Sequence, residues 1–260
     1  MIDIHSHILP GLDDGAQDWE DALALARAAS AEGIETIIAT PHHANGEYDN
    51  VGPRIAPAVQ AMNERLADEG IALTVRAGQE IRVHDDLLDA WARGDLLSLA
   101  GTRYILIELP TSRIPRGLID LLHELKLLNL SPIIAHPERN AEIVSHPERL
   151  AELVAAGAYG QVTTHSLLGA FGKRIEQASW LLCRGGLIHL VSSDAHHVTK
   201  RGFLLQESYR KVNRMLGEKF ELFFRENAEA VLYNGDISPH PPIARNESLW
   251  MKLANILRKS

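Results

Sequence analysis

Short runs of apolar residues alternate along the chain with longer stretches in which apolar residues recur at helical spacing. The short runs are almost continuous in apolar residues, as expected for strands of a parallel sheet that is buried on both faces. They cover residues 2–5, 36–40, 73–78, 104–109, 132–135, 160–164 and 187–192. The pattern therefore predicts seven buried strands.

The stretches between these runs predict amphipathic helices. The first begins after Asp18, whose side chain can cap a helix N-terminus. Its apolar positions are Ala22, Leu23, Leu25, Ala26 and Ala29. The later helices are predicted over residues 55–69, 116–128, 147–156, 173–184 and 202–216.

The regular alternation of strands and helices predicts an α/β fold. Because no strand is followed by a glycine-rich GxGxxG turn, we expect a closed (β/α) barrel and not an open dinucleotide-binding sheet. Residues 1–237 form this barrel in our interpretation. Residues 238–242 are rich in proline and cannot be helical, and residues 249–258 again have helical spacing. We expect 238–260 to be a connection and a C-terminal helix that packs on the barrel.

Composition narrows the setting in which the protein acts. Its 26 basic and 34 acidic side chains give a formal net charge of −8, which argues against broad nucleic-acid binding. The single cysteine cannot form an internal disulfide, which suits a reducing compartment. No apolar run approaches the ~18 residues that a membrane-spanning helix needs, and the N-terminal residues do not resemble a signal peptide. We therefore expect a cytoplasmic protein that does not span a membrane.

Histidine is abundant, with 13 residues, and many of them follow predicted strands. Imidazole or carboxylate groups follow six of the seven strands. In chain order they are His5, His7, Asp13 and Asp14, then His42 and His43, then Glu80, then Glu108, then His136, and finally Asp194 and His196. In α/β barrels the carboxyl ends of the strands carry the active site.

These residue types indicate a metal site. Imidazole and carboxylate without thiolate suit zinc, manganese or iron. Strand alternation places His5 and His7 on one side of the backbone, so that one ion can bind both. Without Asp13 and His43, five histidines and four carboxylates remain as candidate ligands, and these nine are too many for one ion but fit two or three ions that share a carboxylate. Such a cluster lowers the pKa of bound water and holds a phosphoryl oxygen.

Each of these features has a structural explanation when it is taken alone. Glu108 could be a capping or exposed carboxylate, and His136 could be an ordinary buried histidine. The coincidence at six strand ends favours a metal site. For His43, His165 and His197, which adjoin this edge, we expect a role in orienting the ligands.

The same residues resemble the PHP (polymerase and histidinol phosphatase) superfamily, whose signature is an HxH motif, isolated His and Glu ligands and a terminal DxH motif. The chain is more closely similar to the CpsB/CapC family of bacterial protein-tyrosine phosphatases, which belong to capsule and exopolysaccharide operons. The resemblance covers about residues 1–235. It is carried by residues 1–15, 39–43, 134–140 and 192–196, together with Gly46, Tyr48 and Asn50.

The resemblance implies a distorted (β/α)7 TIM-like barrel of the PHP type with two to three divalent ions, manganese first and iron or zinc as alternatives. By matching position, the first ion would take His5, His7, Glu80 and Asp194. The second would share Glu80 and add Glu108 and His136, and the third would take Asp14, His42 and His196. Arg139 and Arg201 match the positions of phosphate-binding arginines in this family.

The implied activity is the hydrolysis of phosphotyrosine on a protein substrate, typically the tail of a membrane-associated bacterial tyrosine autokinase that controls capsular or exopolysaccharide synthesis. A PHP phosphatase of a small metabolite such as histidinol phosphate would share the barrel and the metals. A third possibility is a non-enzymatic metal-binding barrel like those attached to some polymerases. The segment with Gly46, Tyr48 and Asn50 and the His-Pro-Glu-Arg motif at 136–139 favour the tyrosine phosphatase.

Cysteine-based phosphatase chemistry is excluded by spacing. That mechanism needs an arginine six residues after the nucleophilic cysteine, in a loop that surrounds the phosphate. The residue six positions after Cys183 is His189, in a predicted strand. We therefore expect Cys183 to be a small core residue.

Overall fold

The computed structural model describes residues 1–241, and the helix predicted over 249–258 lies outside them. The strands of this part are β1 (Ile2–Ser6), β2 (Thr36–Ala39), β3 (His42–His43), β4 (Thr74–Ala77), β5 (Glu80–Arg82), β6 (Tyr104–Glu108), β7 (Ser131–Ala135), β8 (Tyr159–Thr163) and β9 (Leu190–Ser192). The helices are α1 (Trp19–Glu32), α2 (Gly52–Asp68), α3 (Leu87–Arg93), α4 (Leu118–Leu127), α5 (Ala141–Ser145), α6 (Glu148–Ala155), α7 (Thr164–Leu168), α8 (Lys173–Arg184), α9 (Leu205–Leu216) and α10 (Glu218–Leu232). Two short 3-10 turns, η1 (Leu99–Gly101) and η2 (Pro137–Arg139), complete the set.

All strand pairs are parallel and form two sheets, in the orders β1-β2-β4 and β3-β5-β6-β7-β8-β9. The two sheets share interrupted strands. Ala39 pairs with Ala77 before the breaks and His42 pairs with Glu80 after them, so the register is the same on both sides. β2 with β3, and β4 with β5, are therefore two strands that each contain a short break.

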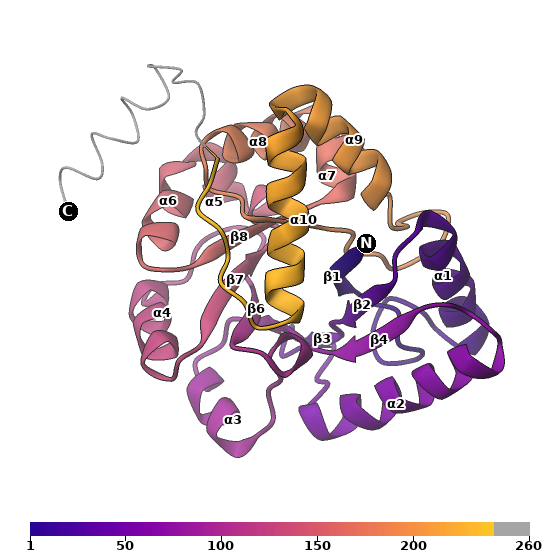
Figure 1. Cartoon of the computed structure of the whole chain (residues 1–260). Coiled ribbons are helices and arrows are strands. Elements are labelled where there is room, and N and C mark those ends of the chain that lie inside the picture. The colour runs from indigo at the N-terminus through magenta and orange to yellow at the C-terminus, as the bar shows by residue number, and fades with distance from the viewer. Residues whose placement is uncertain (242–260) are drawn as a thin grey trace.

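The other edges of the sheets meet where β1 lies beside the residues that follow β9. The Asp194 amide donates to the His5 carbonyl at 2.9 Å, and the His7 amide donates to the Ala195 carbonyl at 2.8 Å. Ser6 and Ala195 form a parallel bridge between these bonds. The architecture is the distorted (β/α)7 barrel that the sequence predicted, with helices arranged around the strands (Figure 1).

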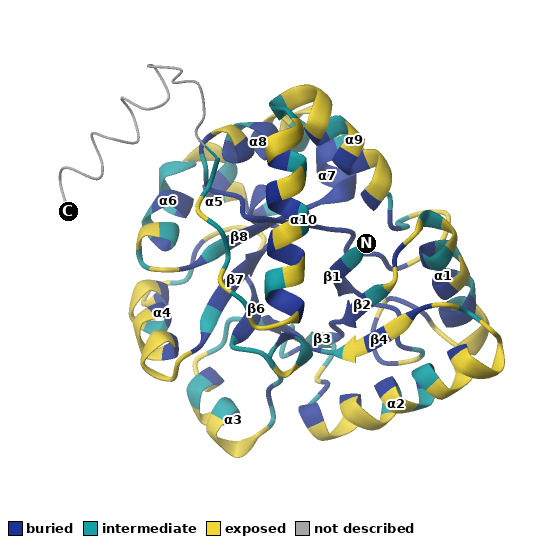
Figure 2. Ribbon diagram, in the orientation of Figure 1, coloured by how far each residue is buried: buried dark blue, intermediate teal, exposed yellow. Residues whose placement is uncertain are grey.

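The amino end of the barrel is covered by α10, which crosses in front of the strands in Figure 1. Asn227 Nδ2 donates to the His189 carbonyl just before β9, and Asn234 Oδ1 accepts from the Arg103 amide just before β6. Ala228 and Val231 pack into the barrel interior with Ile4. A larger apolar layer separates the strands from the outer helices, whose outward faces are exposed (Figure 2). The sequence analysis missed α10 and the shorter α3, α5 and α7.

Residues 238–241 remain in contact with this end of the barrel. The His240 ring lies with its centroid 5.1 Å from those of Phe220 and Phe223. Asn227 Oδ1 accepts from the Ser238 amide at 2.9 Å. Across residues 1–241, no helix combines the length and the apolar character that crossing a membrane requires.

His189 predicts how the stability of the barrel depends on pH. Burial, helped by His240, lowers the pKa of His189 to about 4, and its Nδ1 accepts from the Gly160 amide. An unfolded chain has a histidine pKa near 6.5, so it binds the proton more readily, and stability is lost as pH falls from about 6.5 to 4. We expect a contribution of about 3 kcal/mol to this loss. His189→Gln, which can still accept from Gly160, should flatten the dependence of Tm on pH in this window. If Tm falls equally steeply with pH between 6.5 and 4 in the wild type and in His189→Gln, His189 is not the group responsible.

Candidate metal centre

The nine predicted metal ligands lie together at the carboxyl end of the barrel strands. His5 is in β1, His42 begins β3, Glu80 begins β5 and Glu108 ends β6. The others lie in the segments after β1, β7 and β9: His7, Asp14, His136, Asp194 and His196. Because parallel strands end at one edge of the barrel, residues up to 191 positions apart in the sequence meet here.

Four of these side chains surround one point. His5 Nε2 and His7 Nε2 are 3.2 Å apart, and each lies 3.3 Å from Asp194 Oδ1 and 3.4 Å from Glu80 Oε2. A regular tetrahedron with edges of this length has its corners roughly 2 Å from its centre, which is the usual distance from zinc to imidazole nitrogen or carboxylate oxygen. Five of the six distances among the four donors are therefore those of a tetrahedral metal site.

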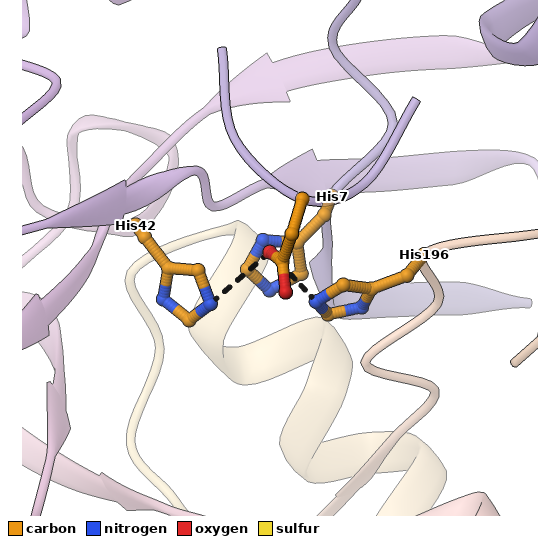
Figure 3. A group of neighbouring side chains, drawn as sticks. His7, His42 and His196 are labelled. Carbon is orange, nitrogen blue, oxygen red and sulfur yellow. Dashed lines mark ion pairs between the residues drawn. The ribbon is translucent and has the colours of Figure 1, made fainter. Parts of the chain in front are cut away.

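A second group lies beside the first. Asp14 Oδ1 is 3.5 Å from His42 Nε2 and 3.3 Å from His196 Nε2, and Figure 3 shows the rings of His42 and His196 on either side of His7. His7 also belongs to this group, and because its Nδ1 is bonded to Asp13 Oδ2 at 2.6 Å, its Nε2 is the nitrogen left for an ion. The second group is therefore Asp14, His42 and His196, with His7 at the border to the first group.

Glu80 connects the first group to a third one. Its Oε2 faces His5 and His7, while its Oε1 lies 2.6 Å from His136 Nε2. His42, Glu80 and Glu108 are also close enough to share an ion. Arg82 Nε donates to Glu108 Oε2 at 2.8 Å and holds that carboxylate in place.

The fit of these residues to cations rests on buried polar atoms that make no hydrogen bond in the described part of the chain, although Glu80 Oε2 and His42 Nδ1 face each other at 2.9 Å. Within residues 1–241, Glu80 Oε2, Asp194 Oδ1 and His42 Nδ1 are buried and make no hydrogen bond. Buried polar atoms in proteins are almost always bonded. All three atoms point into the groups described above, where cations would satisfy them, so the residues present fit divalent metal ions.

The pKa values of Glu80 and His7 indicate that negatively and positively charged groups face each other in the centre. Burial opposes ionisation of Glu80, but the imidazoles of His5, His42 and His136 outweigh it and hold the pKa of Glu80 well below its usual range. Burial likewise opposes protonation of His7, but Asp13 raises its pKa well above the usual value. The carboxylates thus stay charged in a buried site because positive charge faces them, and a bound divalent cation would supply the same compensation.

The backbone around the centre is strained. His136 and Asp194 have φ values of +32° and +55°, in a region that residues other than glycine rarely adopt. Gly15 packs so closely on His7 that an added Cβ would lie 2.0 Å from the His7 carbonyl oxygen. Such conformations persist at functional sites because the surrounding structure enforces them.

Arg139 and Arg201 both contact the centre through Asp194. Arg139 Nη2 lies 2.7 Å from Asp194 Oδ2, and Arg201 pairs with the same oxygen. After the opposing effect of burial, these two arginines are the main reason that the pKa of Asp194 lies well below its usual range. Arg139 also donates to Thr163 Oγ1 at 3.1 Å. Both guanidinium groups therefore lie at the edge of the first metal-ligand group.

The three histidines expected to orient ligands bond elsewhere. His43 Nδ1 lies 3.1 Å from the Asn50 carbonyl oxygen, and His165 Nδ1 lies 3.3 Å from Thr164 Oγ1. His197 is exposed, and its Nδ1 accepts from the Thr199 amide. In residues 1–241 their hydrogen bonds thus go to groups other than the predicted ligands.

Asp13 and Gln161 bond to predicted ligands instead; the sequence analysis noted Asp13 without giving it this role and did not notice Gln161. Asp13 bonds His7, and Gln161 Oε1 lies 3.1 Å from His5 Nδ1. Gln161 is in β8, the one strand for which no ligand was predicted. Gln161 could have been found from the sequence, because it is a polar residue in an otherwise apolar predicted strand. For Asp13 the sequence offered only its position next to Asp14.

Cys183 lies in α8 and is fully buried in the apolar core. Burial raises the pKa of its thiol well above the usual value, so the thiol cannot act as a nucleophile. We expect Cys183→Ser to leave the phosphatase turnover that the family resemblance implies within about twofold, and thiol-alkylating reagents to leave the native protein active. Steady-state kinetics with a thermal melt test this. A large fall in kcat at unchanged Tm would show that the thiol takes part in the reaction.

Comparison with known proteins agrees with this geometry. Residues 1–233 match the family model for capsular polysaccharide synthesis, CpsB/CapC. The chain belongs to the CpsB/CapC family. The tyrosine-protein phosphatase YwqE of Bacillus subtilis is 46% identical over 93% of this chain and 95% of its own length. The CapC protein of Staphylococcus aureus is 36% identical over the same shares, 93% and 95%.

The fold of this CpsB/CapC family member also matches a solved structure. That structure comes from work on YwqE from Bacillus subtilis and CpsB from Streptococcus pneumoniae, described as unique metal-dependent tyrosine phosphatases. It superimposes with a TM-score of 0.89 at 46% identity, over 94% of this chain and 100% of the other. The family resemblance seen in the sequence is therefore confirmed.

Proposed function

We propose that this chain is a metal-dependent phosphatase that hydrolyses phosphotyrosine on proteins. The observation that carries the proposal is the set of four donors, His5, His7, Glu80 and Asp194, with two arginines on the Asp194 side. Membership of the CpsB/CapC family supports it, as does the name of the YwqE relative, tyrosine-protein phosphatase.

Two to three divalent ions would be held by the groups described above. His5, His7, Glu80 and Asp194 would bind the first, Glu80, Glu108 and His136 the second, and Asp14, His42 and His196 the third. When bound, such ions supply Lewis-acid chemistry, by offsetting phosphoryl charge and making a nearby water more acidic. We propose manganese as the ion, with iron or zinc as alternatives, because these ions accept imidazole ligands.

The chain's own residues orient the phosphoryl group. Arg139 and Arg201 present planar guanidinium groups that can donate two parallel hydrogen bonds to phosphate oxygens. Their Nε atoms are buried and make no hydrogen bond within residues 1–241, so both retain free donors beside Asp194. The leaving group needs no strong general acid, because a phenol has a pKa near 10.

The wider setting is proposed from the family resemblance. The substrate would be the tail of a membrane-associated bacterial tyrosine kinase that controls capsular or exopolysaccharide synthesis, and the enzyme would act in the cytoplasm. Residues 1–237 would be the catalytic barrel, and 238–260 would be a proline-rich connection and a C-terminal helix.

The test is a parallel measurement of phosphate release from a phosphotyrosine peptide, a phosphoserine peptide and histidinol phosphate. We expect the highest kcat/KM on the phosphotyrosine peptide. A clear preference for histidinol phosphate would instead identify a phosphatase of small metabolites. Turnover of none of the three by metal-loaded protein would overturn the assignment as a phosphatase.

A further inference from the structure

Two aromatic side chains lie beside the metal centre but belong to none of its ligand groups. Tyr48 is in the segment between β3 and α2, and Phe171 is in the loop between α7 and α8. Tyr48 is half-buried, and Phe171 is 39% exposed, which is unusual for a phenylalanine. The ligands beneath them, His5 and Glu80, are completely buried. The two rings therefore lie nearer the surface than the site at which phosphate would be held.

Phe171 is anchored on a phosphate-binding candidate. The Arg139 Cζ atom lies 4.7 Å from the centroid of the Phe171 ring, a cation–π contact. The His165 ring centroid is 6.0 Å away. Gly169 and Gly172, with φ values of +85° and +90°, form the turns on either side of this exposed ring. The loop thus places an aromatic ring on Arg139 without burying it in the core.

Tyr48 is anchored on the other side, over a ligand candidate. Its ring is stacked with that of His42, with centroids 6.3 Å apart and planes inclined by 12°. Asn45 fixes the turn, because its Oδ1 accepts from the Tyr48 amide at 2.7 Å and from the Glu47 amide at 3.0 Å. The position of this ring is therefore set by its own loop and by the metal centre.

The two rings rise from well-separated parts of the barrel edge. Tyr48 follows β3 and Phe171 follows the strand-to-helix turn after β8. Along the sheet, β5, β6 and β7 lie between β3 and β8 in one direction, and β1 and β9 lie between them in the other. Both loops follow carboxyl ends of strands, so they lie at the edge of the barrel that carries the metal centre.

We propose that Tyr48 and Phe171 hold the phenyl ring of the substrate and thereby set a preference for aryl over alkyl phosphomonoesters. The inference rests on the proposed phosphatase function and deepens it. With the phosphoryl group at Arg139 and the buried ligands, the ester oxygen and its substituent must point outward to the rings. Stacked and edge-to-face aromatic pairs are favourable beyond the area that they bury, and an alkyl chain cannot form them.

The test compares a phosphotyrosine peptide with a phosphoserine peptide of the same sequence. The measured quantity is kcat/KM for the phosphotyrosine peptide divided by kcat/KM for the phosphoserine peptide. In Tyr48→Ala and Phe171→Ala this ratio should fall about fivefold or more, mainly through a higher KM for the phosphotyrosine peptide. Tyr48→Phe keeps the aromatic ring, so its preference for the phosphotyrosine peptide should equal that of the wild type. Phe171→Leu keeps an apolar side chain over Arg139 but removes the ring, so its preference should fall as in Phe171→Ala. Tyr233→Ala, which removes a tyrosine that is 76% exposed on the far side of the barrel, is the matched control and should leave it unchanged.

A binding measurement separates recognition from catalysis. Calorimetric titration of the metal-loaded protein should give phenylphosphonate a lower Kd than methylphosphonate, and both alanine variants should narrow that difference. The inference would be overturned if the wild type prefers phosphotyrosine and both alanine variants keep its kcat/KM ratio and its difference in Kd between the two phosphonates. The proposed function would then stand. A wild-type enzyme without activity on phosphotyrosine would overturn the proposed function itself, and the inference with it.

Discussion

Prolonged incubation with excess EDTA should abolish phosphatase activity, and Mn²⁺ should restore more of it than Mg²⁺. The reason is the composition of the centre. The first ligand group pairs two imidazoles with two carboxylates, and His42, His136 and His196 lie beside it. Mg²⁺ prefers oxygen ligands and keeps several waters, whereas manganese, iron and zinc accept imidazole. Phosphate release and metal content are measured on the same samples.

A pair of histidine variants tests whether the predicted ligands carry this effect. His136→Ala should lose both bound metal and activity, because it removes the imidazole bonded to Glu80 Oε1. His123→Ala removes an exposed histidine from α4 and should change neither. Full activity after long exposure to excess chelator would refute the metal-dependent mechanism. Normal metal content in His136→Ala would remove that residue from the ligand set.

The sequence could predict the candidate ligands because the barrel imposes a simple rule on them. Parallel strands end at one edge, so a residue type that recurs after each strand identifies a site before any contact is known. His5 and Asp194 are 189 positions apart, and their strands nevertheless place them 3.3 Å from each other. Strand order was enough for this inference, and exact helix bounds were not needed.

What the sequence could not supply depends on tertiary contacts. α10 has apolar residues at helical spacing, but its position across the amino end of the barrel depends on Asn227 reaching the His189 carbonyl. The residues that orient ligands are hidden for the same reason. Gln161 and Asp13 are ordinary polar residues in the sequence, and only their distances to His5 and His7 give them a function.

Arg139→Ala should lower kcat on a phosphotyrosine peptide by roughly 10²–10³, the scale of losing one hydrogen-bond donor to the charge that develops in the transition state. Metal content should be retained, although Arg139 pairs with the ligand candidate Asp194. Arg201 binds the same carboxylate oxygen, so Asp194 keeps a charged partner in the variant. Arg139→Lys should recover only part of the activity, because an ammonium cannot replace a planar guanidinium that donates two parallel bonds.

The control for this variant is Arg27→Ala, which removes an arginine paired with Glu69 on the outside of the barrel and should leave kcat unchanged. The measurements are steady-state kinetics, metal content and Tm on each purified protein. A loss of metal that parallels the loss of activity would show that Arg139 acts by holding Asp194. Near-normal kcat and kcat/KM in Arg139→Ala would show that the phosphoryl group is bound without it. A fall in kcat at full metal content would instead place the guanidinium on the phosphoryl group, because arginine cannot itself ligate the ions.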